Sequence, residues 1–259
     1  MKEFLKDTKE SIEQLYGSVI CQKFPMYSTF WNKFIGGKAI NGIPCSYGLV
    51  IPNSLKSKVQ IDETYTEISH THYTLFCHLA GAHFQLENLK SSLKITDDRK
   101  RYFEHWEYFD VFYMHLGIVM YQIYHLWGLV FLLEGVIVRD ENGDFRDSRK
   151  SLKKFLREEN KKLLDELESI DDEVKILRDN ITHYMRTAFY PTRSGYAIPC
   201  KITKNMNWKE CYKKPPYIET HFKTKSDLMH IESFLDKLHA LLFKKFEDYL
   251  FKNKIKVDY

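Results

Sequence analysis

The run Arg-Asp-Asn-Ile-Thr-His at positions 178–183 brings together side chains that can act on a phosphodiester. A neutral histidine can take the proton from a ribose 2′-hydroxyl, and its protonated form can give a proton to the leaving 5′-oxygen. An arginine can stabilise the charge that develops on the phosphate through two parallel hydrogen bonds. The run therefore predicts metal-independent cleavage of RNA, with Arg178 and His183 as the catalytic residues.

The spacing within this run determines how a helix would present it. Asp179 and His183 are four residues apart and share a helix face, so the carboxylate can fix the tautomer of the imidazole. Arg178 and His183 are about 140° apart around a helix and about 7.5 Å apart along it. Asn180 and Thr182 add neutral hydrogen-bonding groups. The same spacing is also typical of an ordinary helix with an exposed arginine and an interfacial histidine.

The stretch EVKILRDNITHY at positions 173–184 resembles the signature of HEPN-domain proteins. In that superfamily an Arg, a following polar residue and a His a few residues later lie in a late helix of an all-α bundle. Arg178, Asp179 and His183 match these three positions. The flanking residues that also look like the family are Leu177, Ile181 and Tyr184.

The resemblance implies an all-α homodimer with a composite site at its interface and metal-independent endoribonuclease activity without a cofactor. A second copy would supply the partner that a single histidine lacks, since one histidine does not readily serve as both base and acid. Such proteins commonly act as toxins, in phage defence or in RNA processing, so an antitoxin or defence-system partner is implied. Members silenced by adenylylation carry a Tyr two residues after the His. The residue here is Met185, so control through that tyrosine is not expected.

Basic residues that follow the run could add contacts to RNA. Arg186 and Arg193 come shortly after it, and Lys213 and Lys214 lie in a segment where lysines alternate with aromatic residues. Lysines steer phosphates and aromatic rings stack on unpaired bases. A solvated loop anchored by its aromatic residues has the same composition. A non-catalytic helical module that binds RNA or a protein is therefore an alternative function.

A group of histidines supports a different hypothesis, a metal-dependent helical enzyme. The residues are His70, His72, His78 and His83 with Cys77 between them, and Glu67 precedes His70 with Glu-x-x-His spacing. Di-iron bundles need a second such pair and further glutamates, which the sequence does not show. Partly buried, hydrogen-bonded helix residues account for the same pattern.

The candidate residues described above need helices to position them. The hydrophobic periodicity of the sequence predicts several helices. The expected helices are 2–24, 63–93, 97–138, 149–169, one that opens at 171–172, and 227–251. Pro and Gly residues predict two loop-rich insertions, 26–60 and 190–223, with a short β-hairpin in an insertion. The expected fold class is an all-α helical bundle. The chain is expected to form a single HEPN-like domain over 1–259, with a motif-bearing bundle at about 100–250 and an N-terminal extension at about 1–95.

The segment 111–138 is long enough for a membrane span and carries one charged residue, Glu134. His115, Gln122 and His125 place a polar stripe along one side of it, which favours a central bundle helix instead.

Composition agrees with a cytoplasmic protein that has no membrane segment. The net charge of +4 permits an acidic partner such as RNA without requiring one. The five cysteines are scattered and form no C-x-x-C pair, which argues against a disulfide framework and a zinc ribbon. No signal-peptide pattern is visible at the start of the sequence, and reduced thiols are expected.

Overall fold

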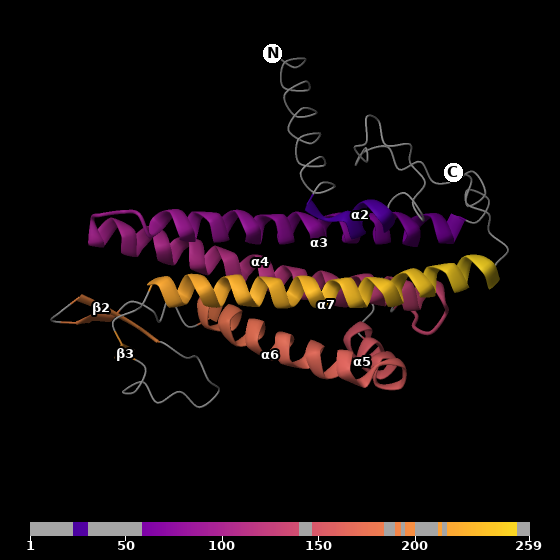
Figure 1. Cartoon of the computed structure of the whole chain (residues 1–259). Coiled ribbons are helices and arrows are strands. Elements are labelled where there is room, and N and C mark those ends of the chain that lie inside the picture. The colour runs from indigo at the N-terminus through magenta and orange to yellow at the C-terminus, as the bar shows by residue number, and fades with distance from the viewer. Residues whose placement is uncertain are drawn as a thin grey trace, which may run out of the picture. The chain divides into compact units, whose positions relative to one another are not determined.

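Helices dominate the structure, a computed structural model that describes residues 23–30, 59–139, 147–183, 190–192, 195–199, 212–213 and 217–252 (Figure 1). The helices are α2 (Pro25–Phe30), α3 (Val59–Ser92), α4 (Asp98–Leu133), α5 (Ser148–Glu159), α6 (Lys161–His183) and α7 (Tyr217–Lys252). The predicted all-α class is confirmed. Residues 2–22 of the helix predicted at 2–24 lie outside the described residues.

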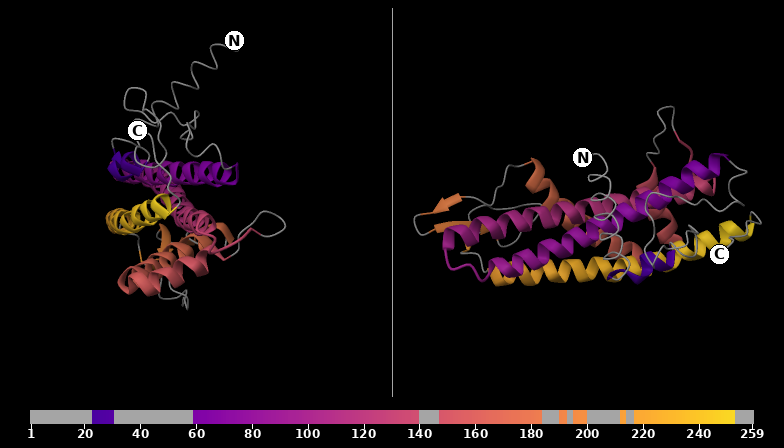
Figure 2. Two further views of the ribbon diagram at one scale, coloured as in Figure 1. Left: turned by 90° about the vertical axis from the view of Figure 1, so that its right-hand side faces the viewer. Right: turned by 90° about the horizontal axis from the view of Figure 1, so that it is seen from above.

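A small antiparallel sheet occupies part of the second insertion (Figure 2). β1 (Tyr190–Thr192) pairs with β2 (Gly195–Pro199), and β2 pairs with β3 (Tyr212–Lys213). Pro191 lies opposite Tyr196 in the β1–β2 hairpin. The sequence predicted a short hairpin without assigning it to either insertion.

The first insertion, predicted to be loop, contains the short helix α2. Pro25 is its first residue, where the fixed backbone angle of proline suits a helix and its missing N–H is not needed. Phe24 and Tyr27 are buried, with ring centroids 5.2 and 5.4 Å from that of Phe76 on α3. The loop prediction failed here because this packing depends on a partner distant in sequence.

Helix α4 ends at Leu133, several residues before the predicted end at 138. Gly135 adopts a φ of 72°. The Val136 N–H bonds to the Phe131 carbonyl at 2.8 Å, and the Gly135 N–H bonds to the Leu132 carbonyl at 3.1 Å. This pair of bonds is a Schellman motif, which satisfies the last carbonyls of a helix and stops it.

The charged stretch after residue 148 breaks at Asn160, where the pattern predicted continuous helix. Asn160 has a φ of −158° and a ψ of 87°, so α5 stops before it and α6 starts after it. Asp171 was expected to open a helix but lies inside α6 and is buried. The boundary was misplaced because aspartate and asparagine both compete for backbone hydrogen bonds, and only context decides which one interrupts the helix.

Helix α7 begins ten residues before Asp227, where the last helix was predicted to start. Thr224 is buried in the added turns, and its hydroxyl bonds to the carbonyls of Thr220 and His221 at 3.1 and 2.9 Å. These contacts satisfy the Thr224 hydroxyl within the helix.

The chain divides into two compact units. Unit 1 comprises Met1–Cys77, Tyr121–Lys161 and Leu235–Tyr259, and unit 2 comprises His78–Met120 and Lys162–Phe234. Within unit 1, Trp127 and Phe131 of α4 pack on Phe155 of α5. Within unit 2, the fully or almost fully buried core residues include Leu79, Leu89, Phe112, Leu116, Leu167, Ile170, Leu228 and Phe234.

Helix α4 is apolar and long enough to cross a membrane, and it is the one such helix among the described residues. Its most apolar stretch is 67% buried inside the protein, as in the core helix of a bundle. His115, Gln122 and His125 are each half-buried, in agreement with a polar stripe on this helix.

Candidate functional site

The Arg-x4-His run lies at the C-terminal end of α6, whose last residue is His183. The helical backbone places position 178 in register with Asp171 and Val174, which are both buried. Position 183 is instead in register with Asp165 and Asp172, which are both exposed. The two candidate positions, 178 and 183, are therefore about 140° apart around α6.

The other predicted site residues divide into two groups. Asp179, Asn180 and Thr182 lie on α6, and Lys213 lies on β3, but the side chains of all four, like those of Arg178 and His183, are outside the described residues. Tyr184, Arg186, Arg193 and Lys214 lie outside the described residues altogether. Their predicted roles stay predictions.

A hydrogen-bonded network in unit 2 fixes α6 shortly before the run. Lys223 on α7 donates to Glu173 on α6 at 2.5 Å and to Asp227 at 2.9 Å. The Tyr113 hydroxyl of α4 donates to the same Asp227 carboxylate at 2.5 Å. The network therefore joins three helices, and its α6 member lies five residues before Arg178.

Burial and charge act together in this network. Burial raises the pKa of Tyr113 well above its usual value, and the neighbouring Asp227 carboxylate raises it further. Burial lowers the pKa of Lys223, but its hydrogen bonds to Glu173 and Asp227 outweigh that effect, and the pKa is raised overall. Tyr113 is thus a neutral donor and Lys223 a cation at neutral pH, which suits a structural anchor.

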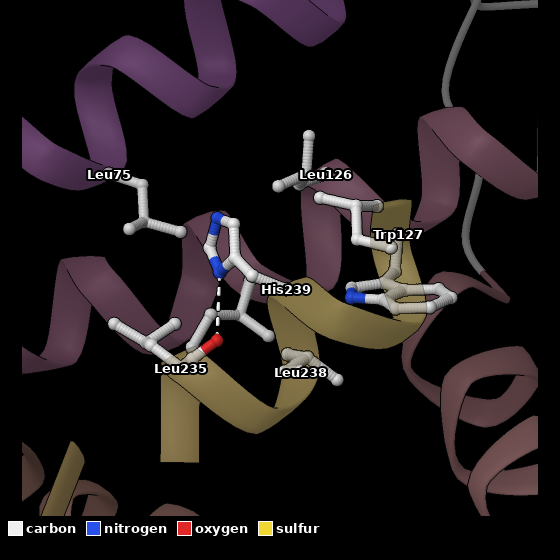
Figure 3. Close-up of a pocket in the computed structure, with 8 residues that line it drawn as sticks. Leu75, Leu126, Trp127, Leu235, Leu238 and His239 are labelled. Atoms are coloured by element: carbon white, nitrogen blue, oxygen red, sulfur yellow. Dashed lines mark hydrogen bonds between the residues drawn. The ribbon is translucent and has the colours of Figure 1, made fainter. Parts of the chain in front are cut away.

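The histidines of α3 do not converge on one site. His72 pairs with His239 of α7 inside unit 1, with 2.9 Å between their Nε2 atoms. His239 Nδ1 donates to the Leu235 carbonyl at 2.8 Å (Figure 3). The Nε2 of neutral His239 therefore carries the lone pair, and His72 Nε2–H is the donor. Burial lowers the pKa of His239 to about 4, although the carbonyl favours the protonated ring. Burial and the neighbouring His239 lower the pKa of His72 well below its usual value.

His239 also lines an apolar pocket in unit 1 (Figure 3). Its lining is Leu75, Ile123, Leu126, Trp127, Leu235, Leu238, His239 and Leu242. The Trp127 Nε1–H is buried and has no hydrogen-bond partner among the described residues. The space between the side chains does not admit a water-sized sphere, so the pocket is packing space within the core and not a ligand site.

In unit 2, His78 bonds to His115 of α4 with 2.9 Å between their Nδ1 atoms. Burial lowers the pKa of both rings, so one neutral ring donates to the other. Gly81 lies against His115, and a Cβ at that position would be 2.5 Å from its Cε1. His83 donates from Nε2 to Glu232 of α7 at 2.5 Å.

The metal hypothesis is not supported within the described part of the chain. No group of three or more His, Cys, Asp or Glu side chains gathers there as metal ligands. Glu67 forms an ion pair with Arg139, and His70 is exposed. The alternative interpretation of the α3 histidines, as partly buried and hydrogen-bonded helix residues, is confirmed for His72, His78 and His83.

The partners of these histidines were missed by sequence reasoning. His239 is 167 residues from His72, and Glu232 is 149 residues from His83. No local spacing can indicate such pairs. The one available signal was that both partners lie on a helix predicted to be amphipathic, at positions that border its apolar side.

Comparisons with protein-family models, curated proteins and solved structures give no match for this chain.

Proposed function

We propose that the protein is a HEPN-like, metal-independent endoribonuclease that acts as a homodimer in the cytoplasm. The observation that carries the proposal is the Arg-x4-His run at 178–183 within a stretch that resembles the HEPN signature. The all-α class and the position of the run on a late helix are what such an enzyme requires.

In the proposed reaction, neutral His183 removes the proton from a ribose 2′-hydroxyl. The 2′-oxygen forms a bond to phosphorus, and the bond from phosphorus to the 5′-oxygen breaks. The leaving oxygen takes a proton from the His183 of a second copy. Arg178 stabilises the charge on the phosphate, and the products are a 2′,3′-cyclic phosphate and a 5′-hydroxyl.

Supporting roles follow for the neighbouring residues. Asp179 is one helical turn from His183 and would orient its imidazole, while Asn180 and Thr182 would hydrogen-bond the substrate. Tyr184, which directly follows His183, is proposed as a further supporting residue of the site. The residues proposed to contact RNA outside the run are Arg186, Arg193, Lys213 and Lys214.

The register of α6 supports a site shared between copies. Positions 178 and 183 both lie within α6, five residues apart, so they do not share one face of the helix. Because about 140° separates them, two chains can supply complementary groups to one phosphate more readily than one chain can. The ion pairs of Lys223 with Glu173 and Asp227 would keep this end of α6 in place.

Cytoplasmic location is part of the proposal. The burial of the most apolar stretch of α4 supports a bundle core helix instead of a membrane span. Cys77, a free thiol, suits a reducing compartment. A role as a toxin or in phage defence, with an antitoxin or defence-system partner, is proposed from the HEPN resemblance.

The proposal is tested by incubating the purified full chain with labelled RNA in the presence of EDTA. We expect cleavage by the unchanged protein and at least a hundredfold loss in His183→Ala and in Arg178→Ala, because removal of a positioned base or of a charge-stabilising group costs on the order of 10² or more. His230→Ala is the matched control, since His230 is half-exposed on α7 and forms an ion pair with Glu166.

Each outcome separates the hypotheses. Cleavage that persists in His183→Ala contradicts the proposed mechanism. RNA binding without product, unaffected by His183→Ala, would support a binding module. Cleavage that EDTA abolishes and added metal restores would support a metal-dependent enzyme instead.

A further inference from the structure

Helix α5, at Ser148–Glu159 in unit 1, has one buried side and one strongly basic side. Leu152 and Leu156 are fully buried, and Phe155 packs on Trp127 and Phe131. The apolar side of the helix is therefore occupied by the core of its own unit.

The opposite side carries Lys150, Lys154 and Arg157, all exposed. Their i, i+4, i+7 spacing puts them on one face, over about 10.5 Å of helix. None of the three forms an ion pair with another residue in the described part of the chain. These three residues are called the cationic face.

The charge pattern of α5 runs against the stability of the helix itself. Its first turn contains no acidic residue but holds Arg149 and Lys150, while Glu158 and Glu159 lie at its end beside one cation, Arg157. Cations at a helix N-terminus and anions at its C-terminus oppose the helix dipole, typically at 0.3–1 kcal/mol for each charge. Asp147 at the N-cap position makes no side-chain hydrogen bond to the first turn. A pattern that opposes local stability is expected where a surface serves a ligand.

We propose that the cationic face binds the phosphate backbone of a nucleic-acid duplex. Regularly spaced cations that form no ion pair among the described residues complement a backbone of closely spaced negative charges, and such contacts release counterions. This binding proposal does not depend on the endoribonuclease proposal. The cationic face belongs to unit 1 and includes no residue of the 178–183 run.

Two other occupants fit the surface less well. Single-strand binding surfaces combine basic residues with aromatic rings on which bases stack, and the cationic face contains none. A helix that lies on a membrane inserts its apolar side, which in α5 is buried in the core. A duplex, recognised by charge and shape alone, requires neither feature.

The test measures binding of the full chain to a 20-base-pair RNA duplex at several salt concentrations, for example by fluorescence anisotropy. Three phosphate contacts give a slope of about −2.7 in log K against log salt, which is about a 40-fold loss of affinity between 50 and 200 mM. Lys150→Gln, Lys154→Gln and Arg157→Gln together should reduce the magnitude of the slope by about 2.7. A DNA duplex should behave similarly, because backbone contacts carry no sequence information.

The matched control removes three other exposed lysines, Lys94, Lys225 and Lys244, by the same substitution. It has the same net charge as the test variant and should keep most of the slope. Circular dichroism and thermal melting show whether both variants are folded. The duplex measurement is repeated in His183→Ala, which should bind as tightly as the unchanged protein.

Three results would overturn the proposal. Equal slopes in the test and control variants would show that net charge and not the cationic face drives binding. Tighter binding of single-stranded RNA of the same length would indicate a stacking surface elsewhere. Stronger binding to vesicles containing anionic phospholipid than to the duplex would identify a membrane as the partner.

Discussion

Acidification from pH 7 to pH 5 should strongly destabilise the protein because its buried histidines fold in the neutral form. Burial lowers the pKa of His239 and of His105 to about 4 from 6.5. The unfolded chain therefore takes up protons as the pH falls below 6.5, while the folded chain does not until about pH 4. Stability is lost across this window and stops changing, for these groups, below about pH 4.

The magnitude follows from the two pKa values. A pKa lowered by about 2.5 corresponds to a total loss of about 3.4 kcal/mol in the free energy of unfolding once the pH is below both pKa values. Between pH 7 and pH 5, linkage gives a loss of about 2 kcal/mol for each histidine. His72, His78 and His115, whose pKa values are also lowered, act in the same direction. A loss of 4 kcal/mol or more is comparable to the whole stability of many domains, typically 5–15 kcal/mol.

Urea unfolding at pH 7 and pH 5 measures this loss, and one pair of variants assigns part of it to His239. His239→Gln lowers stability at pH 7 but should reduce the pH-dependent loss by about 2 kcal/mol. Leu242→Ala, in the same apolar pocket, should cost 2–5 kcal/mol at both pH values and leave the pH-dependent loss unchanged. Equal pH-dependent losses in His239→Gln and in the unchanged protein would refute the reasoning.

Two glycines give further predictions. Gly81→Ala should lower the free energy of unfolding by about 1–3 kcal/mol despite the better helix propensity of alanine, because the new Cβ would lie 2.5 Å from His115. His115→Ala should relieve this cost in the double variant, and additive losses in a double-mutant cycle would contradict the contact. Gly135→Ala should cost about 1–2 kcal/mol in thermal or urea unfolding through backbone strain alone, since its φ is 72° and nothing lies within 4 Å of a Cβ there. If the stability did not change measurably, the role of Gly135 in ending α4 would be contradicted.

The all-α class could be predicted from sequence because it rests on periodicity along each helix. The prediction of a helix at 63–93 agrees closely with α3, whose one interior glycine, Gly81, does not interrupt it. The break at Asn160 could not be predicted, because Asp171 is as good a local signal and lies mid-helix. The early start of α7 depends on contacts such as Lys223 with Glu173, which lie 50 residues apart.

Fewer features of the candidate site than of the fold could be predicted from the sequence. Spacing and resemblance suggest Arg178 and His183 as candidates, and their position on α6 follows from helix periodicity. The network of Tyr113, Asp227 and Lys223 that joins α6 to α4 and α7 could not be foreseen, because its members come from separate helices. The same limit applies to His72 and His239, whose pairing only the packed structure brings together.

The most direct test of the proposed function is the chemistry of the RNA ends that the protein produces. In EDTA, the unchanged protein should yield a 2′,3′-cyclic phosphate and a 5′-hydroxyl, which mass spectrometry of the products distinguishes from other ends. His183→Ala should yield neither. Products with a 5′-phosphate, or the same cyclic ends from His183→Ala, would contradict cleavage by 2′-hydroxyl attack at this site.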